Sequence, residues 1–466
     1  MNYRALLVCL WLMTAGSAFS AVRVREWGVQ PLAGVETASD PKDGEKRRVR
    51  ANAVTTNAGE PEMLAVYPVA GNVGRDLAIP YYVDLDETAA KRDWHCGDLT
   101  FNGHAGHDPY IRSFSEQRIG VPVFAARDGV VVDVRDNEPD ENTTNDPTAR
   151  ANYITLRHDD DEITQYVHLR KGITLATGDT VTAGTQIGWV GSSGMSMGPH
   201  IHFEARHDGV AFEPMAGPCR AGNSYFVDQP TLFGEPVVLG ATFSDRSFSD
   251  FAAPPHDDAP HTGTFVMGQR TVYFKVEVAN VGASTRYKLR IERPGSFRTD
   301  LAASGQLKTI DVSLASVWWG LDVLLDEAGT WALILEINDR RTFRMPFRVV
   351  PTSGEVTNRP PNPVSVAIEP VALRAGQVPV CRATEPNLLP DPDYDVVRYH
   401  YEWRVDGNLV REITSAAQSD ALAREHVAVS SRISCSVTVS DGKASTQPVT
   451  AFSTPVTAVR RRSARP

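Results

Sequence analysis

The sequence predicts a mainly β protein with a compact antiparallel core followed by two β-sandwich units. Short β-rich segments recur between residues 130 and 190, separated by turns that contain glycine and aspartate. Beyond residue 237, longer segments alternate strictly between apolar and polar residues. A stretch rich in Pro, Ser, Thr and Asn at 351–363 is typical of a linker and separates the last two units.

The chain has 466 residues, enough for several domains, and a formal net charge of −10. This charge disfavours general nucleic-acid binding, because phosphate recognition requires a basic surface. Beyond the N-terminal segment, the sequence has no apolar run long enough to span a bilayer. We therefore expect neither a nucleic-acid partner nor a membrane span.

Residues 1–20 have the features of a secretory signal peptide. An apolar stretch follows Arg4, and the residues AFS at 18–20 fit the small-x-small cleavage rule. We therefore expect an exported protein, either periplasmic or extracellular. The next residues, 21–61, have little pattern; we expect a strand or two against the core, or a short inhibitory segment over the site.

Four cysteines remain after the signal peptide, and an even number in an exported chain indicates disulfides. Three pairings are possible in principle. The placement of the cysteines in separate units favours Cys96–Cys219 and Cys381–Cys435.

The first unit, 62–225, contains the short β-rich segments. They lie at 130–134, 153–158, 163–169 and 187–190. Turn residues between them, such as Asp128-Gly129, give the regular spacing of an all-β unit.

The second unit, 237–350, is predicted to be sandwich-like. In "TVYFKVEVAN", the residues Val272, Phe274, Val276 and Val278 fall on one face, as in a half-buried strand. "WALILEIN" repeats the pattern, and a sandwich buries such faces. Residues 301–325 are ambiguous and could include a helix.

The third unit, 364–455, is predicted to be an Ig-like or PKD-like β-module. The order Cys381, Trp403, Cys435 matches the immunoglobulin-like arrangement of a buried tryptophan beside two bridged strands. The segments "DPDYD" and "VTVSDG" resemble such modules of bacterial secreted proteins. The tail 456–466 is basic and is expected to be solvated.

Histidines and one aspartate in the first unit form the strongest chemical pattern. His104 and Asp108 have the spacing HxxxD, and His168 lies in "QYVHL". In "GPHIHFE", His200 and His202 share one face, because residues two apart on a strand point to the same side. Two imidazoles and one carboxylate suit Zn²⁺ and leave its fourth position for water.

The segment from about 62 to 217 resembles the lysostaphin-type (LytM-like) zinc metalloendopeptidases of peptidoglycan. The resemblance lies in the ordered motifs "GHAGHD", "QYVHL" and "GPHIHFEAR". It implies a lysostaphin-like core of the duplicated hybrid motif type. It also implies that His104, Asp108 and His202 bind one Zn²⁺, while His168 and His200 are catalytic and orient the attacking water and stabilise the oxyanion.

The function predicted from this resemblance is hydrolysis of peptide bonds in peptidoglycan stems or cross-links by a zinc-activated water. One alternative is a non-hydrolytic activator of a cell-wall amidase, although such relatives lose metal ligands and none is lost here. The other is a secreted metallopeptidase that acts on proteins. The two C-terminal β-modules are expected to anchor or space the enzyme, with a possible contact to cell-surface glycan or protein.

Two further features of the sequence have more than one interpretation. His107 precedes Asp108 where the family usually has an uncharged residue; it could compete for metal, but we expect it to face solvent or to support the ligands. Asp391, Asp393 and Asp395 alternate in a loop and offer oxygen ligands for Ca²⁺, without a full ligand set of their own.

Overall fold

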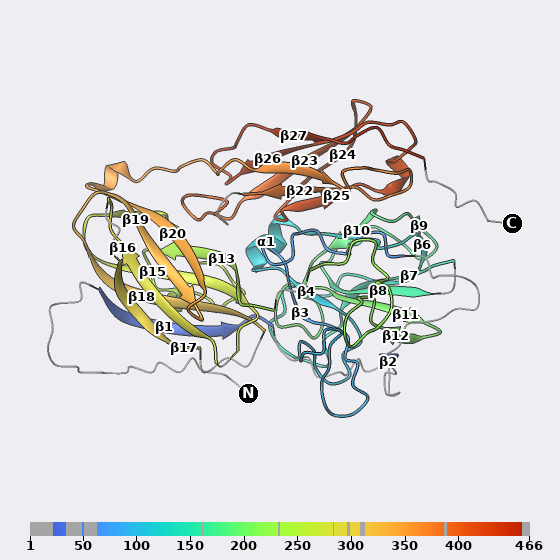
Figure 1. The fold of residues 1–466 in the computed structure, drawn as a ribbon, viewed down its shortest axis with the longest axis horizontal. Helices are drawn as coiled ribbons and strands as arrows, with labels where there is room; N and C mark the ends of the chain where they lie inside the picture. The colour runs from blue at the N-terminus through green and yellow to red at the C-terminus, as the bar shows by residue number, and fades with distance from the viewer. Residues whose placement is uncertain are drawn as a thin grey trace.

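A computed structural model describes residues 22–33, 49–50, 63–159, 162–231, 234–282, 284–295, 299–307, 313–385 and 389–458. The predicted signal peptide lies outside the described residues, as does most of the basic tail. The described chain folds into three β units, which confirms the prediction of a mainly β protein (Figure 1).

The core unit contains the residues of the predicted chemistry. Its elements are β2 (Val49–Arg50), β3 (Ala78–Tyr81), β4 (Asp108–Tyr110), α1 (Phe114–Ile119), β5 (Pro122–Phe124), β6 (Gly129–Arg135), β7 (Asn152–Arg157), β8 (Ile163–Leu169), β9 (Thr180–Val181), β10 (Gln186–Trp189), β11 (His202–His207) and β12 (Val210–Phe212). One sheet has the order β2-β12-β11-β8-β7-β6-β9, while β10 pairs with β5 and β3 pairs with β4.

Alternation along the strands of this sheet explains its core. On β8, Thr164, Tyr166 and His168 are buried, and the residues between them are half-buried. The Tyr166 hydroxyl oxygen accepts a hydrogen bond from the Thr164 hydroxyl at 3.1 Å and another from the Ala126 N–H at 2.9 Å. Buried hydroxyls need such partners, so the face that ends at His168 is held firmly.

The second unit contains β13 (Val237–Ser244), β14 (Thr264–Val266), β15 (Gly268–Ala279), β16 (Arg286–Glu292), β17 (Thr299–Gln306), β18 (Leu314–Leu325), β19 (Gly329–Ile337) and β20 (Arg341–Val350). Its two sheets have the orders β1-β18-β15-β13 and β14-β20-β19-β16-β17. The suggestion that residues 301–325 include a helix is wrong for the described part of this stretch, because its residues contribute to β17 and β18. On β18 the apolar residues alternate and bury one face against the facing sheet.

The first strand of the chain belongs to this second unit. β1 (Val22–Pro31) pairs antiparallel with β18 (Figure 1). The expectation of a strand or two against the core therefore fits β2, which pairs with β12 of the core, and does not fit β1. After β1, Leu32 and Ala33 are buried in a cluster with Tyr110 of the core and Leu314 of β18.

The third unit contains β21 (Ser365–Glu369), β22 (Val380–Thr384), β23 (Arg398–Val405), β24 (Asn408–Ser415), β25 (Ser419–Ala421), β26 (Ile433–Ser440) and β27 (Val449–Phe452). Its sheets have the orders β21-β22-β25 and β24-β23-β26-β27. The Cys381–Cys435 disulfide joins β22 to β26, and the buried Trp403 lies opposite Cys435. The Ig-like assignment of this unit stays a prediction.

Both predicted disulfides are present. Cys96–Cys219 closes the core unit, and Cys381–Cys435 joins the two sheets of the third unit. Each bridge therefore lies within one unit, as the placement of the cysteines along the sequence predicted.

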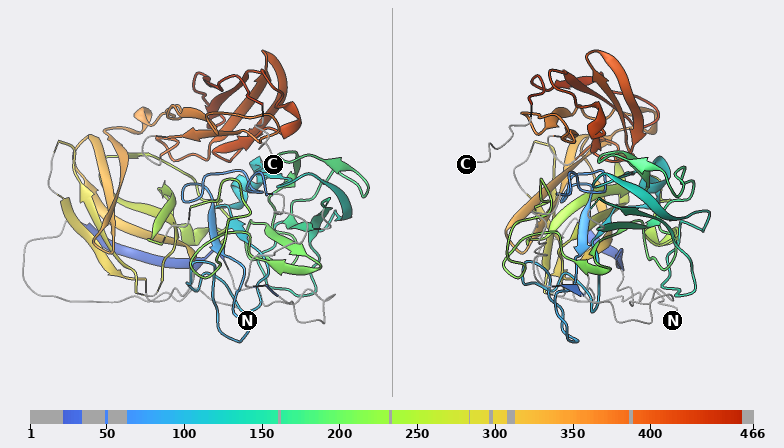
Figure 2. Two further views of the ribbon diagram at one scale, coloured as in Figure 1. Left: turned by 45° about the vertical axis from the view of Figure 1, so that its right-hand side comes forward. Right: turned by 90° about the vertical axis from the view of Figure 1, so that its right-hand side faces the viewer.

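The third unit packs directly on the core, so the linker is not its sole connection to the rest of the protein, as Figure 2 shows from two further directions. Asp76 Oδ2 accepts the Gln418 N–H at 2.6 Å, and Arg424 forms an ion pair with Asp128. A Cβ at Gly184, whose φ is +83°, would lie 2.9 Å from the Val378 side chain. Such close approach explains the glycine at this contact.

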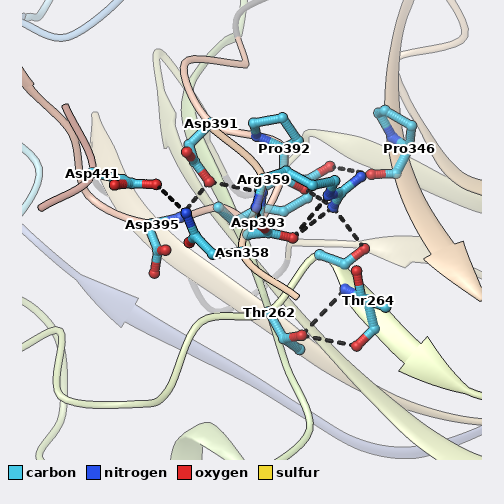
Figure 3. A network of polar contacts seen from close by, with 12 residues as sticks. Thr262, Thr264, Pro346, Asn358, Arg359, Asp391, Pro392, Asp393, Asp395 and Asp441 are labelled. Atoms are coloured by element: carbon cyan, nitrogen blue, oxygen red, sulfur yellow. Dashed lines mark hydrogen bonds and ion pairs between the residues drawn. The ribbon is translucent and has the colours of Figure 1, made fainter. Parts of the chain in front are cut away.

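The linker contacts both C-terminal units through Arg359 (Figure 3). The Arg359 guanidinium donates to the Gly263 carbonyl at 3.1 Å and to Asp393 Oδ1 at 2.7 Å. Beside it, Tyr394 of the third unit packs into the hydrophobic core of the second and donates its hydroxyl to the Pro346 carbonyl at 2.9 Å. The junction between these two units is therefore built from specific polar contacts and a buried aromatic ring.

Candidate metal centre

His104, Asp108 and His202 come together from two distant segments of the core. The backbones of His107 and Phe203 exchange hydrogen bonds of 2.8 Å in each direction, which sets β4 beside β11. Asp108 and His202 are the first residues of these two strands. Each of the three side chains offers one donor atom, and these atoms all lie within 4.8 Å of one another.

The donor atoms are arranged as a metal requires. His104 Nε2 lies 3.1 Å from Asp108 Oδ2 and 3.1 Å from His202 Nδ1, and His202 Nδ1 lies 2.9 Å from Asp108 Oδ1. Ligands at 2.0–2.1 Å from a tetrahedral zinc ion lie about 3.3 Å from one another. The three donors therefore fit around one ion after a shift of a few tenths of an ångström.

Hydrogen bonds determine which ring nitrogen of His104 and of His202 faces the other donor atoms. His104 Nδ1 lies 2.8 Å from the Tyr82 carbonyl oxygen, which can only accept. Nδ1 therefore carries the proton and Nε2 presents its lone pair. For His202 the assignment is the reverse: Nδ1 faces Asp108, and Nε2 lies 3.9 Å from Glu204 Oε1.

The charges of Asp108 and His202 depend on each other and on their neighbours. Burial alone would raise the pKa of Asp108, but its interactions with His104 and His202 outweigh burial and hold this pKa well below its usual range. Burial would lower the pKa of His202, but hydrogen bonds to Asp108 and Glu204 outweigh it and raise this pKa to about 9. Without a metal ion, the proton on His202 balances the carboxylate, and a cation would take its place.

His168 and His200 lie beside this group and are not part of it. His168, at φ +64° near the end of β8, has its Nδ1 2.7 Å from the Ser193 carbonyl oxygen. His200 Nδ1 lies 2.8 Å from the Gly198 carbonyl oxygen. Each Nδ1 therefore carries a proton, and Nε2 is the basic nitrogen of each neutral ring.

The two rings face each other and the metal group. Their centroids are 4.7 Å apart, and the His168 centroid is 6.4 Å from that of His202. His168 and His202 keep 7% of their surface exposed, whereas the other three side chains keep 2% or less. The site therefore reaches solvent along the edge formed by His168 and His202.

Aromatic rings form the walls of the site. Tyr110 stacks on His200 with centroids 4.1 Å apart and an angle of 2° between the planes, and Phe101 stacks on His104 at 4.3 Å. These contacts fix the orientation of rings whose nitrogens must point to one place. Sequence reasoning missed both residues, because a single aromatic residue gives no sign of a role beyond packing until its neighbour is known.

Gly106 is a further residue that sequence reasoning missed. A Cβ at this position would lie 2.5 Å from the Phe203 carbonyl oxygen and 2.8 Å from the His202 ring. A side chain there would force apart β11 and the segment that carries His104 and Asp108. The only signal in the sequence was a glycine inside the HxxxD motif.

His107 does not face solvent, so that part of the expectation is wrong. The side chain is fully buried, and Nε2 lies 2.8 Å from Glu213 Oε1. Glu213 Oε1 also accepts the Met215 N–H at 2.7 Å, so the carboxylate links the HxxxD segment to the chain after β12. His107 supports the position of its neighbour Asp108 and lies outside the group of three.

Residues 113–214 match the protein-family model described as Peptidase family M23. The chain contains an M23 peptidase domain. Three of the five site residues, His168, His200 and His202, lie inside the matched range, and His104 and Asp108 come shortly before it.

Named proteins are similar to part of the chain. The chain is 34% identical over 96 residues to the peptidoglycan DD-endopeptidase ShyC of Vibrio cholerae serotype O1. This alignment covers 21% of the present chain and 20% of ShyC. The chain is 35% identical over 97 residues to the DD-carboxypeptidase/endopeptidase Mpg of Neisseria meningitidis serogroup B, with 21% and 20% covered. The chain thus spans about a fifth of the length of these curated relatives.

Among solved structures, the catalytic domain of the antimicrobial peptidase lysostaphin from Staphylococcus simulans aligns at 26% identity. The alignment covers 30% of this chain and 89% of that chain, with a TM-score of 0.20. No helix in the described part of the chain has the length and hydrophobicity to cross a membrane.

Proposed function

We propose that the protein is an exported zinc metalloendopeptidase that hydrolyses peptide bonds in the stems or cross-links of peptidoglycan. One observation carries the proposal: two imidazoles and a carboxylate with compatible donor atoms meet beside two further imidazoles. The M23 domain supports the class of enzyme. The two disulfides support export, because such bonds persist in oxidising compartments.

The donor set supports zinc as the ion held by His104, Asp108 and His202. Two nitrogens and one carboxylate oxygen suit a borderline-soft ion that accepts four ligands, and three protein ligands leave one position open. Calcium and magnesium prefer oxygen ligands alone. When bound, zinc supplies Lewis-acid polarisation of a carbonyl and acidifies a water molecule.

We assign His168 and His200 to proton transfer and charge stabilisation. The Ser193 and Gly198 carbonyls hold the Nδ1 protons, so each ring works through Nε2. A neutral ring accepts a proton from the attacking water at Nε2, and a protonated ring donates to the oxyanion or to the leaving amine. Tyr110 stacked on His200 keeps that ring in the orientation it needs.

The names of the relatives support peptidoglycan as the substrate. ShyC and ShyA of Vibrio cholerae are both named peptidoglycan DD-endopeptidases, and they are 34% and 40% identical to this chain over 96 and 86 residues.

The test is digestion of purified sacculi and cross-linked muropeptides by the full chain, with and without a chelator. We expect His202→Ala to lose both bound zinc and activity. We expect His200→Ala to keep most of its zinc and to lose turnover, because His200 does not belong to the ligand group. Turnover at the parent rate by His200→Ala would overturn its role.

Two outcomes favour the other functions. A parent protein that holds zinc but cuts neither sacculi nor peptides would favour an activator of a cell-wall amidase. A protein that cuts unfolded polypeptides and leaves sacculi intact would favour a secreted metallopeptidase of proteins. A parent protein without zinc at neutral pH would overturn the proposal as a whole.

A further inference from the structure

A second group of oxygen ligands lies at the junction of the second and third units. It consists of Asp391, Asp395, Asp441 and the linker residue Asn358, which are referred to below as the junction carboxylate cluster (Figure 3). These residues come from three segments that are separated along the sequence and meet beside the Arg359 contacts.

Asp391 is buried with one carboxylate oxygen left over. The residue is 1% exposed, and Oδ1 accepts the N–H groups of Asp393 at 2.7 Å and Asp395 at 3.3 Å. Oδ2 is buried and has no hydrogen-bond partner among the described residues. A buried, unpaired carboxylate oxygen costs free energy, so its presence in a well-packed loop needs a reason.

Asp441 and Asp395 supply the other carboxylates of the cluster. Asp441 Oδ2 accepts the amide N–H of Asn358 at 2.8 Å, which places the Asn358 side-chain amide beside the cluster. Asp395 lies near the exposed end of the cluster, with its Oδ2 2.8 Å from the Lys443 ammonium. In Figure 3 the side chains of Asp391 and Asp441 lie near that of Asn358.

Asp393, the middle residue of the DPDYD segment, is not available as a ligand. Its carboxylate accepts the Arg359 backbone N–H at 2.6 Å and the guanidinium at 2.7 and 3.0 Å. The three alternating aspartates therefore have different contacts: Asp393 holds the linker, Asp391 keeps one buried oxygen without a hydrogen-bond partner in the described chain, and Asp395 pairs with Lys443.

The charge at this point already attracts a cation. A hydrogen bond to Asp395 raises the pKa of Lys443, and the charges of Asp395, Asp441 and Asp391 raise it further. Burial, followed by the neighbouring carboxylates, raises the pKa of Asp391 to about 6 although two backbone N–H groups oppose this. The Lys443 ammonium is therefore attracted by three carboxylates. Since its side chain is 61% exposed, Lys443 contacts the cluster only at the solvent-facing edge.

We propose that the junction carboxylate cluster binds one Ca²⁺ ion, which links the second and third units. Calcium takes six to eight oxygen ligands in flexible geometry and accepts amide and backbone carbonyl oxygens besides carboxylates. The three carboxylates are less tightly gathered than the donor atoms of His104, Asp108 and His202. An ion would draw Asp395 away from Lys443 and give Asp391 Oδ2 the partner it lacks.

Calcium here would act on the relative position of two units. Tyr394 lies between Asp393 and Asp395 and is buried in the hydrophobic core of the second unit. Asn358 belongs to the linker, and Asp441 follows β26 of the third unit. An ion held by these residues therefore stabilises the linker and the Tyr394 contact together, independently of the zinc site.

The test compares thermal unfolding of the full chain in chelator and in calcium. A His202→Ala background removes the zinc site, so that effects of the chelator arise elsewhere. With Ca²⁺ at about 5 mM, above the range of 10⁻⁴ to 10⁻³ M that is typical of extracellular modules, we expect a rise in the unfolding midpoint of about 4 °C or more. We expect Mg²⁺ at the same concentration to give less than half of this rise, because it requires near-ideal octahedral geometry.

Asp391→Asn separates the ligand role from the turn. Asparagine keeps an oxygen for the N–H groups of residues 393 and 395 and removes the buried charge. In chelator, this variant should unfold at the midpoint of its parent or above it. In Ca²⁺ it should show no rise, whereas Asp406→Asn, at an exposed turn carboxylate of the same unit that accepts the Arg432 N–H, should rise with the parent.

Lys443→Gln gives the opposite direction, because it removes the ammonium that competes for the cluster. We expect calorimetric titration with CaCl₂ to show tighter binding than in the parent, by several fold. A parent midpoint that does not move with Ca²⁺ would overturn the proposal, and so would an Asp391→Asn variant that rises as much as its parent. Neither result bears on zinc or on peptide hydrolysis.

Discussion

Two buried clusters in this protein pair a histidine with an aspartate four positions away, and they differ in what balances the carboxylate. In the second unit, Asp257 lies 3.2 Å from His261 and 2.7 Å from the buried ammonium of Lys275, which also reaches Glu277 at 3.4 Å. In the core, the ion pairs of Asp108 within the described chain are with His104 and His202.

The difference separates a structural cluster from a metal centre. A histidine beside a carboxylate is not enough to indicate a metal, because Asp257 and His261 have that geometry and obtain their cation from the protein. Asp108 has two imidazoles in place of an ammonium, and imidazoles can give up their protons to a metal ion. The two clusters therefore differ in one feature. The chain supplies an ammonium beside Asp257, whereas a second imidazole takes that place beside Asp108.

The largest effect is expected from Asp108→Asn. The substitution removes the anionic ligand, so bound zinc should fall from about one per chain to below about 0.1, with a loss of activity of about a thousandfold. Metal analysis of the purified protein and digestion of sacculi measure the two effects. Asp257→Asn is the matched control and should keep its zinc; if it loses zinc as well, the distinction between the clusters fails.

Lys275→Met tests the structural cluster in return. Removing the ammonium leaves Asp257 and Glu277 buried without their cation, which should cost about 3–5 kcal/mol of unfolding free energy. Urea unfolding measures the loss, and bound zinc should not change in the fraction that stays folded. Lys275→Arg keeps the charge and should lose less; equal losses for both variants would show that packing rather than charge is responsible.

Glu204→Gln tests how the core cluster orients a ligand. Glu204 is buried, its Oε2 accepts the Arg206 Nε–H at 2.8 Å, and its Oε1 faces His202 Nε2 at 3.9 Å. Carboxylates behind a metal-binding histidine fix its orientation, and we expect a loss of about 10- to 100-fold in zinc affinity. Competition with a zinc chelator of known affinity gives the constant.

The matched control for Glu204 lies in the third unit. Arg404 donates to Glu402 at 2.9 Å with the same spacing of two residues along a strand, far from the site. Glu402→Gln should leave zinc affinity unchanged. Equal affinity of Glu204→Gln and the parent protein would remove Glu204 from the site.

Local periodicity accounts for the parts that could be predicted from the sequence. Val272 to Val278 alternate and form β15 as expected, and His200 and His202 turn to one side because they are two residues apart. The disulfides followed from the assignment of each cysteine pair to one unit. In each case neighbouring positions along the chain contain the information.

Partners that are distant along the chain could not be predicted in the same way. Residues 22–31 have little pattern, and nothing local specifies whether β1 pairs with the core or with β18. His107 beside Asp108 gives no sign of Glu213, which lies 106 positions away. The buried Asp391 oxygen depends on the meeting of the linker with two loops, and no local pattern encodes that meeting.

The smallest effect is expected from His261→Gln, and it lies in pH dependence. Burial would lower the pKa of His261, but Asp257 outweighs burial and raises it. A pKa that is higher in the folded than in the unfolded protein adds stability that is fully present below about pH 6.5 and is lost as pH rises through the folded pKa. The stability advantage of the parent protein over His261→Gln should therefore be largest at mildly acidic pH and shrink as pH rises. Urea unfolding across this range measures it, with the exposed His95→Gln as control; an advantage that grows with pH would show that Asp257 does not stabilise a protonated His261.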